Sequence, residues 1–186
     1  PAIDEATIQR HPGYTWEFPA GIQRQLVPRV SVDLSYFRRL YGNFVVTDNR
    51  ATSPADFDPF SITAPTDPRL PNGGGYQVNG LYNLNPARVG RVDNLITQAS
   101  DYGKQIERWN GFDLTMNARL RDGAVLQGGL STGRTLTDDC EVRRALDNPS
   151  ELYCRTQTPF LTQFKLLGAY TVPRVDLQVS ATFQSV

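Results

Sequence analysis

Two cysteines are the residues whose type and spacing most directly suggest chemistry in this chain. Cys140 and Cys154 are separated by a polar segment that contains the turn sequence Asn148-Pro149-Ser150. Two cysteines that close one exposed loop are typical of a disulfide formed in an oxidising compartment. Two unrelated free thiols are the alternative. We expect the disulfide, which would contribute about 3 kcal/mol in the loop-entropy description.

No other residue set has the spacing of a catalytic or metal site. His11 is the only histidine and lies far in sequence from both cysteines, so we expect neither a Cys–His pair nor a bound metal. The neighbouring carboxylates Asp138 and Asp139 are typical of a solvated loop. Residues 72–75, Asn-Gly-Gly-Gly, lack the following Lys-Ser/Thr of a phosphate-binding loop. We expect no enzyme activity and no cofactor.

The segment 47–103 holds the best candidates for ligand binding, since connections of this length are usually functional. Aromatic rings there would stack on a sugar or peptide, and carboxylates would accept its hydrogen bonds. The candidates are Phe57, Phe60, Tyr76, Tyr82, Asp56 and Asp58. The alternative is that these aromatic rings only pack the loop onto the strands. Asn79-Gly80 predicts the turn of a small hairpin, and Asn85-Pro86 predicts a short helical turn.

Alternating apolar and polar residues predict the strands that position these loops. From Phe112 to Leu120 the even-numbered residues are apolar, whereas Asp113, Thr115, Asn117 and Arg119 share the other parity, which is the period of a β-strand. Five further segments alternate in the same way. The predicted strands are 13–26, 29–47, 104–120, 124–137, 159–172 and 175–186.

Tight and long connections alternate between these strands. The tight turns lie near 27–29, at 121–123 and at 173–174, and the long loops are 47–103 and 138–158. The tight turns of an antiparallel meander with this alternation all lie at one end of the sheet. We therefore predict an all-β protein, an up-and-down meander of about six long strands. Long strands, short turns at one end and long loops at the other are typical of an outer-membrane β-barrel.

Three arginines on the apolar parity test the barrel prediction. Arg38, Arg108 and Arg134 lie about nine, twelve and ten residues from their tight turns. Ten residues of a tilted strand rise about 23 Å, close to the ~25 Å height of the apolar band of a barrel. All three would thus reach its outer edge, and Arg24 lies near the opposite edge. The predicted aromatic girdle consists of Trp16, Tyr36, Trp109 and Phe160.

The opposite parity of the strands would then line a polar lumen. The predicted lumen-facing residues are Asp33, Asp113, Thr115, Asn117, Arg119, Gln127, Lys165, Asp176 and Gln178. Membrane barrels need at least about eight strands, so we expect residues 1–186 to be a partial barrel and a segment of a longer polypeptide. The chain carries no initial Met or signal peptide and stops within a predicted strand.

The composition of the chain is consistent with this interpretation. Lys plus Arg and Asp plus Glu both number 19, and this balance gives no electrostatic reason to expect nucleic acid as a partner. Mean hydropathy is −0.40, and no apolar run approaches the ~18 residues of a membrane helix. Barrel strands are only half apolar and therefore pass unnoticed in hydropathy profiles.

Three segments resemble outer-membrane receptors of the TonB-dependent type, in particular large receptor-like barrels with an N-terminal carboxypeptidase-regulatory-like domain. They are RVSVDLSYFRRLYGNFVVTDN (29–49), DFDPFSITAPTDPRLPNGGG (56–75) and SDYGKQIERWNGFDLTMNARLRDG (100–123). The resemblance covers most of residues 13–186 and matches the C-terminal portion of the barrel. The energy-coupling box, the plug and the final strands have no counterpart in this sequence.

The resemblance implies a barrel of about 22 strands with a plug, in the outer membrane of a Gram-negative-type bacterium. It also implies uptake of a small-molecule, sugar or peptide ligand, driven by an inner-membrane energy-coupling complex. The partners would be the lipid bilayer and the remainder of the barrel and plug. One alternative is an outer-membrane barrel that serves as an adhesion or structural scaffold without transport. A second alternative is a soluble all-β binding domain.

Overall fold

The structure is a computed structural model that describes residues 2–120 and 123–185. Strands dominate these residues and the helices are short, which confirms the predicted all-β class. The chain divides into two compact units. The sheet unit comprises Thr15–Leu40, Arg108–Leu136 and Gln157–Val186, and the loop unit comprises Pro1–Tyr14, Tyr41–Glu107 and Thr137–Thr156.

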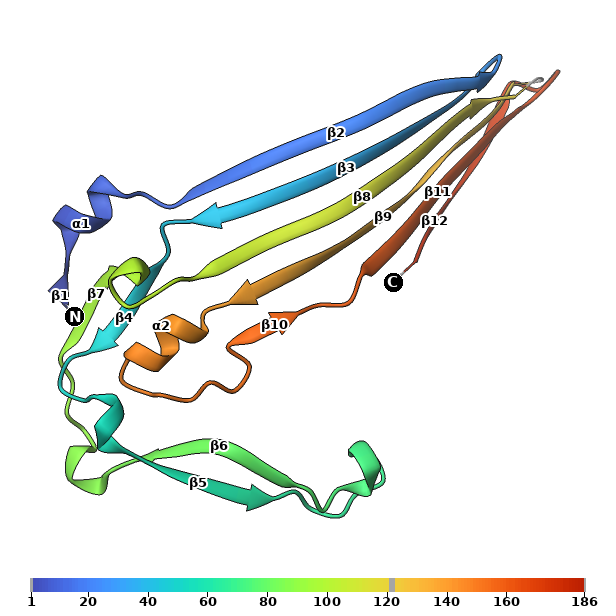
Figure 1. The fold of residues 1–186 in the computed structure, drawn as a ribbon. Coiled ribbons are helices and arrows are strands. Elements are labelled where there is room, and N and C mark those ends of the chain that lie inside the picture. The colour runs from blue at the N-terminus through green and yellow to red at the C-terminus, as the bar shows by residue number, and fades with distance from the viewer. Residues whose placement is uncertain (1, 121–122, 186) are drawn as a thin grey trace. The chain divides into compact units, whose positions relative to one another are not determined.

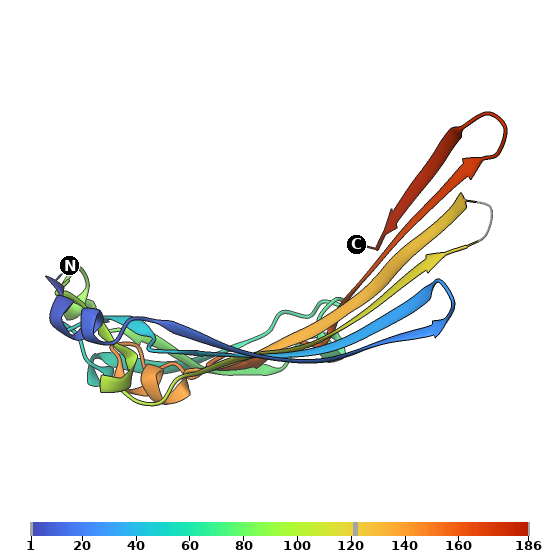
Figure 2. The ribbon, with the colours of Figure 1, turned by 90° about the horizontal axis from the view of Figure 1, so that it is seen from above.

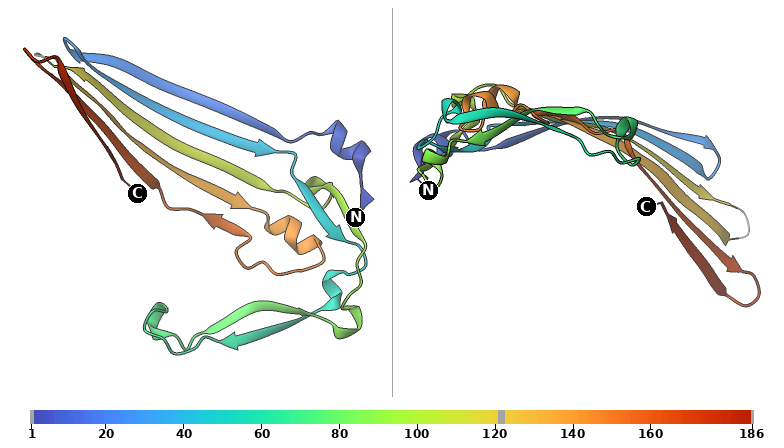
Figure 3. Two further views of the ribbon diagram at one scale, coloured as in Figure 1. Left: turned by 180° about the vertical axis from the view of Figure 1, so that it is seen from behind. Right: turned by 90° about the horizontal axis from the view of Figure 1, so that it is seen from below.

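Six long strands form the sheet unit, in an order that follows the chain (Figure 1). They are β2 (Tyr14–Val27), β3 (Val30–Gly42), β8 (Ile106–Arg119), β9 (Ala124–Asp138), β11 (Leu161–Val172) and β12 (Leu177–Gln184). The short strand β10 (Arg155–Gln157) also pairs with β9. Figure 2 shows the hairpins β2–β3, β8–β9 and β11–β12 in succession, and Figure 3 shows the same order from behind and below.

The turns of the β2–β3 and β11–β12 hairpins are tight, but the second of these is longer than predicted. Pro28-Arg29 joins β2 to β3, with Arg29 at a φ of 73°. Of the second turn, predicted at residues 121–123, Arg121 and Asp122 lie outside the described residues, and Gly123 has a φ of 76°. The third turn occupies residues 173–176, because Val172 pairs with Leu177 across β11 and β12.

The predicted strand 29–47 is in fact two strands of different sheets. β3 ends at Gly42, and Asn43 turns the chain with a φ of 57°. The Asn43 amide donates a hydrogen bond to the Pro12 carbonyl at 2.9 Å. The next strand, β4 (Val45–Asn49), pairs antiparallel with β7 (Asn94–Gln98) in the loop unit. Alternation alone did not reveal this break because the apolar parity continues through residues 44 and 46.

The core of the loop unit lies around a three-stranded sheet of order β1-β7-β4, in which β1 (Ala2–Ile3) pairs parallel with β7. Thr97, Gln98 and Ala99 are buried there. The α1 helix (Glu5–Arg10) begins at Asp4, whose carboxylate accepts a hydrogen bond from the Thr7 amide at 3.2 Å. This contact is a normal N-cap and fixes the start of the helix.

A separate hairpin in the loop unit pairs β5 (Phe57–Thr63) with β6 (Gln77–Leu84). The predicted turn at Asn79-Gly80 is wrong. Both residues lie within β6, at a bulge where the register shifts, and Gly80 has a φ of 76°. A glycine with positive φ suits a bulge as well as a turn, so the dipeptide did not discriminate between them. Three 3₁₀ turns surround the hairpin: η1 (Pro54–Asp56), η2 (Pro71–Gly73) and η3 (Pro86–Arg88).

Two local predictions in the loop unit are confirmed. The Asn85 side chain accepts a hydrogen bond from the Ala87 amide at 3.0 Å and caps η3. A disulfide joins Cys140 and Cys154, with their Cα atoms 4.8 Å apart. The disulfide ties α2 (Cys140–Ala145) to the end of the following loop. A further 3₁₀ turn, η4 (Ala99–Asp101), follows β7.

Candidate functional site

Two chemically different faces characterise the sheet unit, because cross-strand pairs join residues of like character. We call them the polar face and the apolar face. The apolar pairs include Leu130–Phe164, Leu166–Phe183 and Tyr170–Val179, and the polar pairs include Ser131–Gln163, Lys165–Gln184 and Thr171–Gln178. A slip of one residue would mix the two sets, so the observed register preserves the alternation predicted for β9, β11 and β12.

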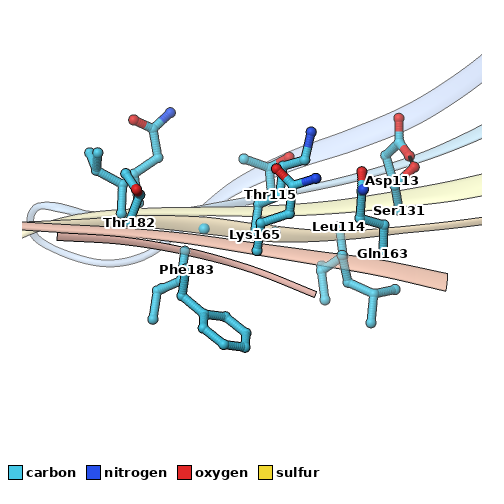
Figure 4. Close-up of a pocket in the computed structure, with 15 residues that line it drawn as sticks. Asp113, Leu114, Thr115, Ser131, Gln163, Lys165, Thr182 and Phe183 are labelled. Carbon is cyan, nitrogen blue, oxygen red and sulfur yellow. Dashed lines mark hydrogen bonds between the residues drawn. The ribbon is translucent and has the colours of Figure 1, made fainter. Parts of the chain in front are cut away.

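The β8 strand adds its predicted polar residues to the polar face. The Ser131 hydroxyl of β9 donates a hydrogen bond to the Asp113 carboxylate at 2.5 Å. The backbones of β8 and β9 approach closely at Gly129, which lies beside Thr115. A Cβ added at Gly129 would lie 2.6 Å from the Leu114 carbonyl oxygen. Figure 4 shows the two sides of the sheet directly: polar side chains such as Asp113, Lys165 and Gln163 project from one side, and Leu114 and Phe183 from the other.

A hollow of about 700 Å³ lies beside these strands. Apolar-face residues such as Leu114 and Phe183 form part of its lining, and its polar side chains include Asp113, Thr115, Gln127, Ser131 and Lys165. They supply hydroxyl, amide, carboxylate and ammonium groups, which suit water or a polar solute. None of the residues lining this hollow is a histidine or a cysteine, so the arrangement can bind by hydrogen bonding but lacks a Cys–His or Ser–His pair.

A second hollow, of about 650 Å³, brings together other predicted lumen residues. Asn117, Arg119 and Gln127 line it, together with Gln25 and Ser31. Gln127 thus belongs to both hollows. Sequence alternation identified the Asn117 and Arg119 side of this hollow. The contribution of β2, through Gln23 and Gln25, was visible as polar parity but was not singled out as part of a site.

The three remaining predicted lumen residues are placed differently. Asp33 accepts a hydrogen bond from the Ser35 hydroxyl at 2.8 Å. Gln178 pairs with Thr171 on the polar side of β12. Asp176 lies in the turn before β12, with a φ of 47°, and is not a strand residue. The turn takes up this residue because β12 starts at Leu177, two residues later than the alternation suggested.

Trp109 differs from its predicted place in the outward girdle. Its ring covers Gly111 and Gly133, where an added Cβ would lie 2.1 and 2.4 Å from ring atoms. Gly133 shares the parity of Ser131, so the ring lies on the polar face. The Arg39 guanidinium stands 5.4 Å from the ring centroid and forms an ion pair with Glu17. Parity could have given this result, since Trp109 is odd-numbered like Asp113.

The apolar face carries large side chains that remain solvent-exposed. Trp16 is 60%, Ile22 66% and Phe183 59% exposed. Phe112, Leu114, Leu130 and Phe164 are exposed as well. Large exposed apolar patches are commonly interaction surfaces in proteins.

One part of the apolar face is cationic. Arg38, Arg108 and Arg134, which the sequence placed at similar heights, line a single hollow of about 360 Å³. Asn110 and Phe160 line it too. Asn110 and Gln157 are residues of this hollow that the sequence did not single out. Asn110 shares the parity of Arg108 in the sequence, but only the structure shows that Asn110 and Gln157 lie beside the three arginines.

The six ligand-loop candidates do not converge on one site. In the β5–β6 hairpin, Pro59 pairs with Tyr82 and Phe60 with Leu81. Phe57 and Tyr82 therefore share one face, whereas Asp58 and Phe60 share the other. Tyr76 precedes β6 and is exposed. Asp56 is already engaged by Ser53 and by an ion pair with Arg88 at 2.9 Å.

Two titratable groups of the loop unit have shifted pKa values. The Ser53 backbone amide, donating at 2.9 Å, is the main cause that lowers the pKa of Asp56, with the Ser53 hydroxyl and Arg88 acting in the same direction. Burial raises the pKa of Tyr102 to about 12, helped by its hydrogen bond to Asp48 at 2.8 Å. Both groups are held in the protonation state that their contacts need at neutral pH.

Neither a metal centre nor a spanning helix is found among residues 2–120 and 123–185. No group of three or more His, Cys, Asp or Glu residues there could hold a metal ion. No helix in the described part of the chain is long and apolar enough to cross a bilayer. No protein-family model, no curated protein and no solved structure matches this chain.

Proposed function

We propose that this chain forms part of the wall of an outer-membrane β-barrel of the receptor or transporter type. The polar face would line the lumen, and the apolar face would contact lipid. The observation that carries the proposal is the two-faced sheet: long strands whose register keeps apolar pairs on one side and polar pairs on the other. Membrane barrels alternate in this way because each strand separates lipid from an aqueous interior.

Exposure of the apolar face supports lipid as its neighbour. A water-soluble sheet would bury Trp16, Ile22 and Phe183 in a core, yet each is more than half exposed. At about 25 cal/mol per Å² of apolar area, leaving such side chains in water would be costly. A bilayer would remove this cost without a second protein layer.

The ends of the strand order indicate how the wall would be completed. Within the described residues, β2 and β12 terminate the order of the sheet. A bilayer does not accept unpaired strand edges, because their backbone groups would lack hydrogen-bond partners. Since barrels need at least about eight strands, we propose that strands outside residues 2–185 pair with β2 and β12.

The transport part of the proposal rests on the resemblance to TonB-dependent receptors and on the polar hollows. Asp113, Lys165 and Arg119 offer charges of both signs on the polar face. Such a surface suits the passage of a small polar solute, sugar or peptide rather than its chemical conversion. Energy for uptake would come from an inner-membrane coupling complex. The loop unit would contribute to ligand capture through the β5–β6 hairpin.

Single-cysteine labelling of the full-length polypeptide in outer-membrane fractions tests the proposal. Leu114→Cys and Thr115→Cys would be made in a C140S/C154S background and treated with a lipid-soluble and a water-soluble probe. Phe183→Cys and Gln184→Cys provide a second adjacent pair on β12. We expect the lipid-soluble probe to modify positions 114 and 183, and the aqueous probe to modify 115 and 184. Protection of Leu114→Cys from both probes would mean that the apolar face is covered by protein.

A further inference from the structure

Three arginines lie on the face that the proposed function assigns to lipid. Arg38 comes from β3, Arg108 from β8 and Arg134 from β9, and one hollow of about 360 Å³ joins them. An arginine in the middle of a lipid-facing surface costs about 2–4 kcal/mol, but little at the interface. Their common position across three strands needs an explanation, because the chain as a whole has no net charge.

Contacts around the hollow fix its shape. The Tyr36 hydroxyl donates a hydrogen bond to the Asn110 side-chain oxygen at 2.9 Å. The Tyr36 and Phe112 rings lie 5.0 Å apart, and the Arg134 guanidinium stands 4.8 Å from the Phe160 centroid. The Asn110 oxygen is thus occupied, and its NH₂ group remains as a donor. Aromatic rings form the apolar part of the hollow, and guanidinium and amide groups form its polar part.

The positive charge in the hollow has no counterion among the residues that the structure describes. None of the described residues that line it is acidic. Every ion pair found among residues 2–120 and 123–185 involves an arginine other than Arg38, Arg108 and Arg134. Neighbouring Arg39 illustrates the contrast, since it projects to the polar face and pairs with Glu17. Three like charges around one hollow repel one another unless an anion lies between them.

We propose that this hollow binds the phosphate of a lipid headgroup, an inference that rests on the proposed membrane function. Guanidinium groups match phosphate oxygens with paired, charge-assisted hydrogen bonds. The Asn110 and Gln157 amides add donors for further oxygens. Phe112 continues the apolar face toward Leu114 on the same side of β8. This surface would receive the acyl chains of the lipid while the headgroup occupies the hollow.

Aromatic lining favours a lipid over free phosphate as the source of the anion. Tyr36, Phe112 and Phe160 line the same hollow as the arginines. Tyrosine and other aromatic residues are enriched where hydrocarbon meets headgroups, whereas a site for a small inorganic ion gains nothing from exposed rings. The alternative is that the arginines merely extend their side chains into water. In that case they would show no preference for a phosphate headgroup, so a binding experiment can distinguish this alternative from a headgroup site.

The test uses the full-length protein in nonionic detergent, with lipid binding measured by native mass spectrometry. The probes are a phosphatidic acid, a phosphatidylcholine with the same acyl chains, and inorganic phosphate. The variant R38Q/R108Q/R134Q removes the charges but keeps long polar side chains. The control variant R24Q/R174Q removes two exposed arginines from a β2 position and a β11–β12 turn position, away from the hollow. The single variant R134K keeps charge but loses the planar fork.

We expect the affinity for phosphatidic acid to fall at least about tenfold in the triple variant, and to be unchanged in the control. R134K should give a smaller loss, and phosphatidylcholine should bind more weakly than phosphatidic acid to the unaltered protein. Unchanged affinity in the triple variant would refute the site. Displacement of phosphatidic acid by inorganic phosphate at equal concentration would reassign the hollow to the free ion.

Cysteine labelling at Leu114 in the same preparations separates this inference from the proposed function. Lipid-probe labelling of Leu114→Cys together with unchanged lipid binding by the triple variant would overturn the headgroup site alone. Absence of lipid-probe labelling would overturn both. Labelling combined with loss of phosphatidic acid binding in the triple variant would support both.

Discussion

The Trp109 ring can take its position only because two neighbouring residues are glycines without a Cβ atom. The ring covers Gly111 and Gly133, and a Cβ at Gly133 would lie 2.4 Å from a ring carbon. Gly133→Ala should therefore tilt the ring and lower the free energy of unfolding by about 1–3 kcal/mol, the range for overpacking. Urea unfolding in detergent and Trp fluorescence in a Trp16→Phe background would measure both effects. Gly168→Ala is the control, because open space surrounds that position; equal behaviour of the two variants would contradict the prediction.

Tyr102 gives a pH-dependent prediction for the loop unit. Burial and the Asp48 hydrogen bond raise its pKa to about 12, above the ordinary 10.0. Between these values the folded state retains a proton that the unfolded state has lost, so stability should fall as pH rises across this window. Tyr102→Phe should remove the part of this fall in the free energy of unfolding that comes from Tyr102. Urea unfolding at several pH values would measure it. Tyr153→Phe, at an 82% exposed position, is the matched control substitution. The same slope in Y102F as in the unaltered chain would contradict the assignment.

The α2 helix is too short to be stable alone, since it has six residues and isolated helices need about twelve. The Cys140–Cys154 disulfide, which closes a separation of 14 residues, supplies the missing constraint together with the buried Val142. C140S/C154S should therefore lower the free energy of unfolding by about 3 kcal/mol and speed proteolysis within residues 146–153. Reduction of the disulfide in the unaltered chain should reproduce this result. If C140S/C154S resisted proteolysis as well as the unaltered chain, packing alone would hold the loop.

Local periodicity predicts the long strands of this protein but not the small ones. Over β8 and β9, alternation identifies both faces because each strand has more than ten residues. β1 and β4 have two and five residues, and both pair with β7, which lies far away in sequence. No period can be measured over such lengths, and their pairing is decided by tertiary contacts. The chain therefore leaves β3 at Gly42 without any change in its pattern.

The candidate site residues also divide into those that local alternation predicts and those that depend on tertiary contacts. Asp113, Thr115 and Lys165 were predicted to share a face by parity, and the structure places them around one hollow. Asn110 and Gln157 escaped notice because their role depends on which strands are neighbours. The ligand-loop aromatics Phe57 and Phe60 were grouped by composition, yet the β5 pleat turns them to opposite faces.

The molecule as a whole is organised by the contrast between the faces of its sheet, and a charge placed on either face tests it. Leu130 lies six residues along β9 from Ala124, a rise of about 14 Å, near the middle of a ~25 Å apolar band. Leu130→Arg should destabilise the membrane-inserted state by about 2–4 kcal/mol. Gln127→Arg, on the polar face of the same strand, should have little effect, because its side chain would remain in an aqueous lumen.

Urea titration of the folded protein in lipid vesicles would measure both variants. The comparison is informative because the two positions share a strand and a substitution, and both lie within the ~25 Å band, about 7 Å apart in height. A soluble domain whose apolar face packs against protein would also suffer from Leu130→Arg, but its stability would not depend on lipid. Repeating the titration in vesicles of thinner bilayers, which move Leu130 closer to the interface, should reduce the cost of L130R and leave Q127R unchanged. A cost of L130R that is independent of bilayer thickness would place the apolar face against protein instead of lipid.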